Sequence, residues 1–202
     1  MKLYYSPGTC SLSPHIALKE AGISAQYIKI VAGQAPEDGS DYSKINPNGY
    51  VPALVLDDGQ IITEGVSIVQ YIADQVPNKQ LAPPAGSLER YRLISWLNFI
   101  STELHKAFSP LFHAEVPDVC KALSREQLAK RLHYVNDQLN DKPFLMGALF
   151  SVADAYLFTM LSWAAYVDLD LTPWPNLVAY SKQVAARPAV RAALIEEGLL
   201  QA

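Results

Sequence analysis

One cysteine lies where a thiol becomes reactive. An extended segment from Leu3 to Pro7 runs through Gly8-Thr9-Cys10-Ser11 into a helical pattern that we expect to begin at Pro14. The unpaired N–H groups and the positive dipole end at the front of a helix stabilise a thiolate, which can lower a cysteine pKa from about 8.5 to roughly 3.5–7.5. Cys10 is therefore either a reactive thiol or a small residue buried under a turn, since cysteines are often buried.

A second feature is a proline that opens an expected strand. The turn-forming run Asn46-Pro47-Asn48-Gly49-Tyr50 leads directly into Val51-Pro52. Proline cannot donate to a sheet ladder, so it suits an edge or a special turn, and we predict a cis Val51–Pro52 bond. Such a corner would point the N–H and C=O of Val51 outward, where they can pair with an extended peptide. A tight structural turn is the alternative.

A third feature, Thr63-Glu64-Gly65, lies between an expected strand and an expected helix. Free N–H groups at a helix start bind anions, and a neighbouring carboxylate can bind an ammonium group. The pair suits the head group of an amino acid. An ordinary acidic helix cap is the alternative.

The expected helix at 88–112 carries two separate stripes. At about 100° per residue, one stripe is apolar and the other polar. The apolar stripe, which we assign to the core, contains Leu93, Leu97, Ile100, Leu104, Phe108 and Leu111. The polar stripe contains Asn98, Ser101, Thr102, His105 and Lys106, and it is either a binding face or a solvated one. Glu103 points about 140° away from Asn98, so it could reach the pocket of a second subunit instead.

The sequence Ser151-Val152-Ala153-Asp154 fits a capping box, in which the serine and the aspartate satisfy each other's helix-end donors. We expect its role to be structural.

The elements that must position these residues change in character along the chain. The first part predicts strands at 2–5, 26–31, 52–56 and 60–63, helices at 15–21 (ended by Gly22) and 64–74, a loop at 33–41 and a hairpin turn at Asp57-Asp58-Gly59. Prolines and a glycine cluster between Val76 and Ser87, and beyond them only helical patterns follow, at 88–112, 124–140, 152–166 and 177–196. We therefore predict an α/β domain at 1–79, a linker at 80–87 and an all-helical domain at 88–202.

Composition limits the classes of partner. The 202 residues are 50% hydrophobic, enough for a substantial core, and the net charge is −4 with scattered Lys and Arg. We expect neither nucleic acid nor an anionic membrane as a partner. The two cysteines, Cys10 and Cys120, are too few for a disulfide framework, and the start does not resemble a signal peptide, so we expect a cytoplasmic protein. The apolar runs are shorter than the roughly 20 residues that span a bilayer.

In this order, the segments together resemble the beta class of the bacterial glutathione S-transferase family. The resemblance covers the whole chain and rests on Met1 to His15, Asn46-Pro47 to Val51-Pro52, Thr63-Glu64-Gly65, Trp96 to Phe99, Glu103 to Lys106 and Ser151 to Tyr156. It implies a thioredoxin-like N-terminal domain, a helical-bundle C-terminal domain and a two-fold homodimer.

The resemblance also implies the ligand, glutathione, which is a co-substrate, and no metal. The residues implied to bind it are Cys10, Gln34, Tyr50, Val51, Pro52, Glu64, Gly65, Asn98, His105 and Lys106, with Thr102 and Glu103 serving the pocket of the neighbouring subunit. Tyr50 stands where many relatives have glutamine, and Gln34 near a position that is often lysine. We therefore expect glutathione binding to be somewhat weaker than in those relatives.

The implied chemistry is activation of the glutathione thiol, followed by conjugation to a small electrophile. Cys10 would approach the glutathione sulfur and support disulfide or peroxide chemistry, His105 would act as a donor or base, and Ser11 stands near a hydroxyl that other classes use. The implied walls of the hydrophobic substrate pocket are Phe108, Phe112, Trp163 and Tyr166, with a core role as the alternative. A mainly redox or dehalogenating enzyme, and a non-catalytic binding protein of the same fold, are the other functions considered.

Overall fold

The structure is a computed structural model that describes residues 1–201. It divides into two compact units. One comprises Met1–Ala82 together with the segment from Arg187 on, and the other comprises Pro83–Ala186. We expected the helical domain to continue to the C-terminus, but helix α9 (Pro188–Glu196) lies in the first unit.

The first unit is built on a four-stranded sheet with the order β2-β1-β3-β4. Strand β1 pairs in parallel with β2 and antiparallel with β3, and β3 pairs antiparallel with β4. The bounds are β1 Lys2–Tyr5, β2 Gln26–Lys29, β3 Ala53–Val55 and β4 Ile61–Thr63. The βαβ unit followed by a hairpin is confirmed, although β2 ends two residues before the predicted Val31.

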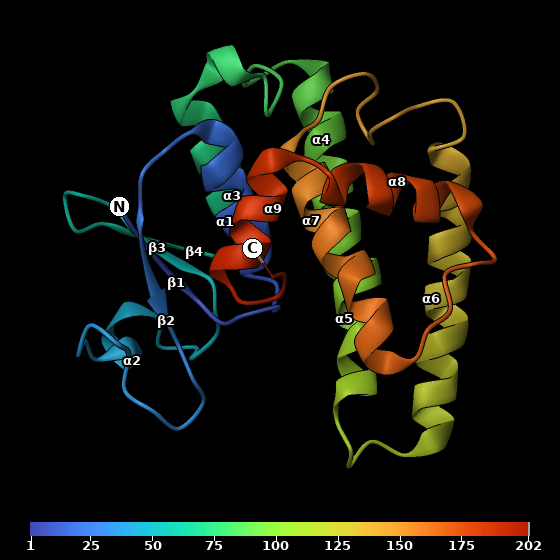
Figure 1. The fold of residues 1–202 in the computed structure, drawn as a ribbon, viewed down its shortest axis with the longest axis horizontal. Helices are drawn as coiled ribbons and strands as arrows, with labels where there is room; N and C mark the ends of the chain where they lie inside the picture. The colour runs from blue at the N-terminus through green and yellow to red at the C-terminus, as the bar shows by residue number, and fades with distance from the viewer. Residues whose placement is uncertain (202) are drawn as a thin grey trace. The chain divides into compact units, whose positions relative to one another are not determined.

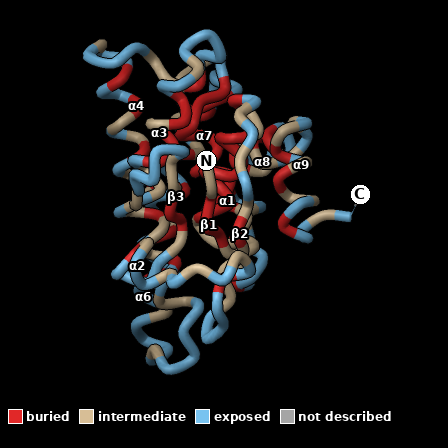
Figure 2. Tube along the Cα trace, turned by 90° about the vertical axis from the view of Figure 1, so that its left-hand side faces the viewer, coloured by how far each residue is buried: buried red, intermediate tan, exposed pale blue. Residues whose placement is uncertain are grey.

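Helices cover this sheet (Figure 1). They are α1 Leu12–Ala21 and α3 Gly65–Gln75, with α9 packed against α1, and a short helix that we did not predict, α2, spans Tyr42–Ile45. Figure 2 shows β1 and much of α1 buried, and the side chains of Leu3, Ile16 and Ile72 are fully enclosed. Burying each such side chain contributes about 1.5–3 kcal/mol, so the sheet and α1 form the rigid base of this unit.

The first residues of α1 correct one prediction. The helix begins at Leu12 rather than Pro14, and it ends as predicted at Gly22, whose φ of 70° suits a left-handed C-cap. Pro14 fits within the first turn because a helix leaves its first N–H groups without an internal partner. Cys10 therefore lies just before the N-cap residue Ser11.

The second unit is entirely helical apart from one isolated bridge among its described residues. Its helices are α4 Leu88–Phe99, α5 Lys106–Phe108, α6 Asp118–Gln138, α7 Val152–Ser162 and α8 Pro175–Ala185. A π-helical turn, Ile100–His105, joins α4 to α5, and 3₁₀ turns span Ser109–Phe112 and Trp163–Val167. The single helix predicted at 88–112 is therefore one continuous path whose winding changes three times, from α to π, back to α and then to 3₁₀.

The single helix predicted at 177–196 is wrong. The path breaks at Arg187, which has extended backbone (φ −66°, ψ 134°) because Pro188 follows it. The two parts, α8 and α9, belong to different units. The helix predicted at 124–140 begins earlier, at Asp118.

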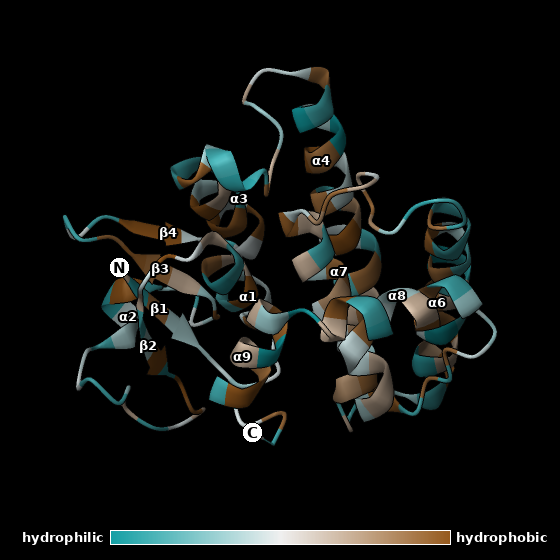
Figure 3. Ribbon diagram, turned by 45° about the horizontal axis from the view of Figure 1, so that its top comes forward, coloured by the Kyte–Doolittle hydropathy of each residue, from teal (hydrophilic) through white to brown (hydrophobic). Residues whose placement is uncertain are grey.

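Two helices of the second unit differ in polarity, as Figure 3 shows. Much of α6 is hydrophilic, whereas α7 is buried from Val152 to Leu161. The predicted capping box starts α7: Asp154 Oδ2 accepts hydrogen bonds from the backbone N–H and the hydroxyl of Ser151, both at 2.8 Å. Its Oδ1 accepts from Leu145 N at 2.9 Å and from the Tyr180 hydroxyl at 3.0 Å. The structural role predicted for this motif follows from these contacts.

Among the described residues, no helix combines the length and the apolar character needed to cross a membrane.

Candidate active site

Cys10 and the Val51–Pro52 corner lie against each other in the first unit. The Cys10 thiol donates to the Val51 carbonyl oxygen, with 3.3 Å between the sulfur and the oxygen, although the residues are 41 positions apart. The Val51–Pro52 bond is cis, as predicted. Cys10 is partly exposed, so the reading of a residue buried under a turn does not describe it.

The corner keeps one backbone donor unused. The N–H of Val51 forms no hydrogen bond with any other described residue. The neighbouring Tyr50 carbonyl, in contrast, accepts from the Tyr42 hydroxyl at 2.7 Å and from Asn46 Nδ2 at 2.6 Å. Asn46 is buried and holds the turn, a role that the sequence analysis missed. The corner is therefore fixed from within while the Val51 N–H stays available to an extended ligand.

The start of α3 lies beside this corner. A Cβ added to Gly65 would lie 3.8 Å from Pro52 Cγ. Glu64 has φ 67° and ψ 116°, a conformation that a non-glycine residue adopts only under strain. Its exposed side chain makes no capping hydrogen bond, so the alternative of an ordinary acidic cap is wrong. The carboxylate and the helix start are both available to a ligand.

Ser11, which we expected to take part in catalysis, is fully buried. Its hydroxyl oxygen accepts from the Ser6 N–H at 3.0 Å and lies 2.8 Å from Thr9 Oγ1, and the hydroxyl donates to the Ser6 carbonyl at 3.1 Å. These bonds close the loop before α1. The geometry therefore gives Ser11 the task of holding the loop that carries Cys10.

A buried carboxylate from the C-terminal segment fastens the same loop. Glu197, which is 6% exposed, accepts from the Gly8 N–H at 2.8 Å, and its other oxygen lies 2.9 Å from Nδ1 of the fully buried His15. The second ring nitrogen of His15 lies 3.0 Å from Glu196 Oε2. The sequence analysis missed this contact because 182 positions separate His15 from Glu197 and no motif joins them.

The loop that carries Gln34 is anchored at Asp38. Its carboxylate accepts from Lys2 Nζ at 3.2 Å, from the Tyr4 hydroxyl at 2.9 Å and from the Ser40 hydroxyl at 2.6 Å. Burial opposes ionisation of this group, but the hydrogen bonds outweigh it and lower the pKa of Asp38 to about 2. The side chains of Gln34 and Tyr50 are exposed, so both are accessible to a ligand in this unit.

Among the candidate residues of the helical unit, His105 has the pKa that its surroundings shift most. Its Nδ1 lies 2.7 Å from the Tyr156 hydroxyl oxygen, and the Trp163 ring meets the imidazole edge-on at 4.9 Å between centroids. Burial, together with the positive charge of Lys106, lowers the pKa of His105 to about 4. The imidazole is therefore neutral at pH 7.

The polar stripe lies along the π-helical turn and its neighbours. Asn98, Thr102 and Lys106 are exposed, and the Thr102 hydroxyl donates to the Asn98 carbonyl at 3.0 Å. Glu103 does not belong to this stripe. Its side chain faces α6, where Arg131 Nε donates to Glu103 Oε2 at 2.7 Å. The predicted core stripe is fully buried from Leu93 to Phe108, and Leu111 is only partly buried.

The four aromatic residues predicted as pocket walls divide into two groups. Phe108 and Trp163 are buried, at 0% and 8% exposure, as in the core alternative. Phe112 and Tyr166 are exposed, at 45% and 63%. Because the Phe112 ring meets Trp163 edge-on at 5.3 Å, Phe112 and Trp163 form one aromatic cluster with His105.

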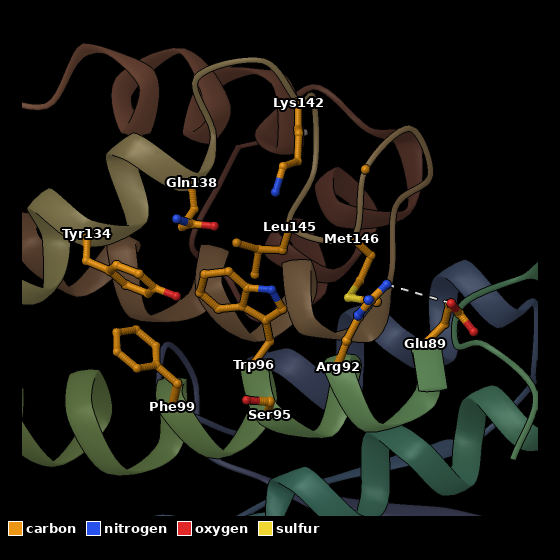
Figure 4. Close-up of a pocket in the computed structure, with 11 residues that line it drawn as sticks. Glu89, Arg92, Ser95, Trp96, Phe99, Tyr134, Gln138, Lys142, Leu145 and Met146 are labelled. Atoms are coloured by element: carbon orange, nitrogen blue, oxygen red, sulfur yellow. Dashed lines mark ion pairs between the residues drawn. The ribbon is translucent and has the colours of Figure 1, made fainter. Parts of the chain in front are cut away.

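The helical unit also holds two cavities between the α4 to α5 path and α6. The first, of about 620 Å³, has an aromatic wall of Trp96, Phe99 and Tyr134, with Arg92 and Lys142 also lining it (Figure 4). The second, of about 650 Å³, is lined in part by Thr102, Glu103 and Lys106. Among residues 1–201, no group of three or more His, Cys, Asp or Glu side chains could hold a metal ion.

A cis-proline corner facing a cysteine at a helix start, on a mixed four-stranded sheet, defines a thioredoxin-like unit, here joined in sequence to an all-helical unit. Residues 8–75 match the family model for the glutathione S-transferase N-terminal domain, and residues 99–188 match that for the C-terminal domain. The chain belongs to the glutathione S-transferase family.

Individual relatives place it more closely. It is 48% identical to glutathione S-transferase GstA from Escherichia coli O157:H7 over 98% of this chain and all of that protein. A beta-class glutathione S-transferase from Sphingomonas chungbukensis is 49% identical with a TM-score of 0.95, covering 99% of this chain and all of the other. A sphingomonad glutathione S-transferase solved in complex with glutathione is 48% identical, with the same TM-score and coverage. The predicted membership of the beta class of glutathione transferases is confirmed.

Proposed function

We propose that this glutathione transferase binds reduced glutathione in an extended conformation along the Val51–Pro52 corner. The observation that carries the proposal is the unused Val51 N–H beside a cis-proline, with the Cys10 sulfur 3.3 Å from the carbonyl of the same residue. The cysteinyl backbone of the tripeptide would pair with Val51, which brings its sulfur toward Cys10. The glutathione complex of the sphingomonad relative supports this choice of ligand.

The γ-glutamyl end of the tripeptide carries both an ammonium and a carboxylate. The Glu64 carboxylate suits the ammonium, and the first N–H groups of α3 suit the carboxylate. The strained backbone of Glu64 supports this assignment, because strain of this kind persists where function requires the conformation. Gly65 lies close to Pro52, so the two subsites are adjacent.

The remaining contacts are proposed from the resemblance and from exposure. Asn98, His105 and Lys106 would contact glutathione from the helical unit, and Thr102 and Glu103 would contact the glutathione of a partner subunit. Gln34 would meet the glycine carboxylate without the charge that lysine supplies, and Tyr50 would contribute through its backbone. Phe112 and Tyr166, the two exposed members of the four aromatic residues predicted as pocket walls, would contact the hydrophobic co-substrate.

The proposed reaction is conjugation. The glutathione thiol gives up its proton to solvent, and the thiolate attacks an electrophilic carbon, whose leaving group departs with the bonding electron pair. Donors aimed at the sulfur stabilise the thiolate. Lys106, the residue after His105, would supply a positive charge that stabilises the thiolate.

A second activity, thiol transfer, is favoured by the position of Cys10 at the Val51 carbonyl. As a thiolate, Cys10 would attack the glutathione sulfur of a mixed disulfide between glutathione and a second thiol, which joins glutathione to Cys10 through a disulfide bond and releases the second thiol as a thiolate. A glutathione thiolate would then attack the glutathione sulfur bound to Cys10, which regenerates the Cys10 thiolate and releases glutathione disulfide, so that the substrate disulfide is reduced and glutathione is oxidised. This chemistry agrees with the cytoplasmic, reducing location that we propose for the protein.

The active form is proposed to be a homodimer. The aromatic wall of Trp96, Phe99 and Tyr134 is the kind of partly exposed apolar surface that a second copy covers (Figure 4). Thr102 and Glu103 line the second cavity, and in the proposed dimer they would face the glutathione site of the partner subunit.

The test replaces Cys10 with Ala and uses Cys120→Ala, which removes the other, exposed cysteine, as the matched control. We expect Cys10→Ala to bind glutathione in calorimetry and to retain conjugation while losing thiol transfer, and Cys120→Ala to retain both. Failure of the unmodified protein to bind glutathione would refute the proposed function. Unchanged thiol transfer in Cys10→Ala would refute only the role of Cys10.

A further inference from the structure

The contact between His105 and Tyr156 decides what the imidazole can do. A neutral imidazole carries a proton on one ring nitrogen and a lone pair on the other, and the partner of one nitrogen determines the state of the other. Here the Tyr156 hydroxyl oxygen lies 2.7 Å from Nδ1, and Nε2 has no hydrogen-bond partner among the described residues. The Tyr156 contact therefore controls the nitrogen that remains available.

The chemistry of the pair favours one direction for this hydrogen bond. A phenolic O–H is a stronger donor than a neutral imidazole N–H, and an imidazole nitrogen is a better acceptor than a phenolic oxygen. The bond is strongest when the Tyr156 hydroxyl donates to Nδ1 of His105. The proton of the neutral ring then resides on Nε2.

The surroundings hold both side chains in place. Tyr156 is 4% exposed and lies on α7, shortly after the capping box that starts this helix. The two rings meet edge-on, at 6.0 Å between centroids and 89° between planes, and Trp163 packs against a further part of the imidazole. His105 ends a π-helical turn, a rare winding that is frequent at functional sites.

We propose that Tyr156 is a positioning residue that fixes His105 in the Nε2–H tautomer, so that His105 donates a hydrogen bond to the glutathione sulfur and does not act as a general base. This rests on the proposed function, in which His105 contacts glutathione, and on the family resemblance, which implies a donor or base role for His105. The thiol proton passes to solvent, Nε2–H donates to the thiolate that forms, and His105 neither gains nor loses a proton. Burial and Lys106 keep the ring neutral at pH 7, in agreement with this role.

The first test reads the tautomer directly. Two-bond ¹⁵N–¹H spectra of the unmodified protein distinguish the two neutral tautomers, and a His105→Gln spectrum assigns the His105 signals. We expect Nε2–H in the unmodified protein and a mixture of tautomers in Tyr156→Phe. The exposed Tyr91 provides the matched control, and Tyr91→Phe is expected to leave the signals unchanged. An Nδ1–H tautomer in the unmodified protein would overturn the proposal. A single Nε2–H tautomer in Tyr156→Phe would also overturn it, because the tautomer would then not depend on Tyr156.

The second test separates a donor from a base without altering Tyr156. Glutamine places an N–H near the position of Nε2 but cannot accept the thiol proton as imidazole does. We expect His105→Gln to lower kcat by less than about tenfold, since it keeps one hydrogen bond, and His105→Phe to lower it further. Loss of a general base would lower kcat by 10²–10⁴-fold in both variants, and that result would overturn the proposal.

Tyr156→Phe should lower kcat by roughly fivefold through the orientation of His105, with little change in the KM for glutathione. In a His105→Phe background the same change should have no further effect, whereas a purely structural role would give an additive loss. Glutathione calorimetry on the unmodified protein distinguishes the two levels of failure. Without binding the proposed function fails, and with binding but the wrong tautomer only this inference fails.

Discussion

The segment around Cys10 and the segment around His105 are positioned by different means. At Cys10 the devices are mainly in the backbone: a cis Val51–Pro52 bond, a strained Glu64 and a helix that starts two residues later. At His105 they are side chains: the hydroxyl of Tyr156 on α7 and the ring of Trp163, which comes directly after α7. Backbone devices leave local signals in a sequence, whereas side-chain contacts between helices do not. The first segment was therefore easier to predict than the second.

The largest expected effect is a loss of stability at the cap of α7, the helix that carries Tyr156, and it tests whether side chains position the His105 segment. Asp154→Ala removes the capping box and leaves the buried N–H groups of Leu145 and Ser151 without their acceptor. We expect the free energy of unfolding to fall by about 3 kcal/mol or more. Urea unfolding measures it, with the exposed Asp141→Ala as a control that should change it by less than about 0.5 kcal/mol. An equal loss in the two variants would show that the cap does not position α7.

The next effect tests whether the Cys10 segment is positioned by its backbone alone. Glu197→Gln replaces the buried carboxylate that accepts from Gly8 and contacts His15. We expect a loss of about 1–3 kcal/mol in unfolding free energy, because hydrogen bonds to a charged group are stronger than those to a neutral amide. We also expect faster modification of Cys10 by a thiol reagent as its loop loosens. Glu196→Gln, at a more exposed carboxylate, should have a smaller effect. If Glu197→Gln has no effect on either measurement, backbone devices suffice at Cys10.

A third prediction concerns pH. The pKa of His105 is about 4 in the folded chain against about 6.5 for an unperturbed histidine, so the unfolded chain binds this proton first as pH falls. The stability that His105 contributes is fully present above about pH 6.5 and is lost progressively as pH falls to about 4. An NMR titration of the imidazole, assigned with His105→Gln, measures the midpoint. A midpoint near 6.5 would show that burial does not govern this ring.

The smallest expected effect is a change in glutathione affinity at Gln34, an exposed loop residue in the unit that contains Cys10. Gln34→Lys adds a positive charge at an exposed position of the loop anchored by Asp38. We expect glutathione affinity to rise by about twofold to fivefold at low salt, since exposed ion pairs contribute about 0.2–1 kcal/mol. Calorimetry measures the change, and Gln34→Met controls for side-chain length. An unchanged Kd in Gln34→Lys would remove this position from the proposed site.

Much of the fold could be predicted because its signals are local. The cis-proline corner, the hairpin around Asp57-Asp58-Gly59, the left-handed Gly22 and the capping box at Ser151 each depend on a few adjacent residues. The break at Arg187-Pro188 had the same kind of local signal and was missed, because the apolar period on each side of the proline suggested one helix.

The rest depends on contacts between distant positions. Glu197 reaches Gly8 across 189 positions and Tyr156 reaches His105 across 51, and no spacing rule joins either pair. The function predicted for Ser11 was misplaced for the same reason, since only the folded loop shows that its hydroxyl is already bonded to Ser6. The π-helical turn also gave no signal, because the apolar stripe from Leu93 to Phe108 suits an ordinary helix.

The central claim is that the sulfur of a tripeptide paired with Val51 meets Cys10. The most direct measurement is mass spectrometry with peptide mapping, after brief exposure of the intact protein to a small excess of glutathione disulfide. The account predicts one glutathionyl group on Cys10, formed faster than on the exposed Cys120 and lost in Cys10→Ala. Modification of Cys120 alone, or of both cysteines at equal rates, would contradict it.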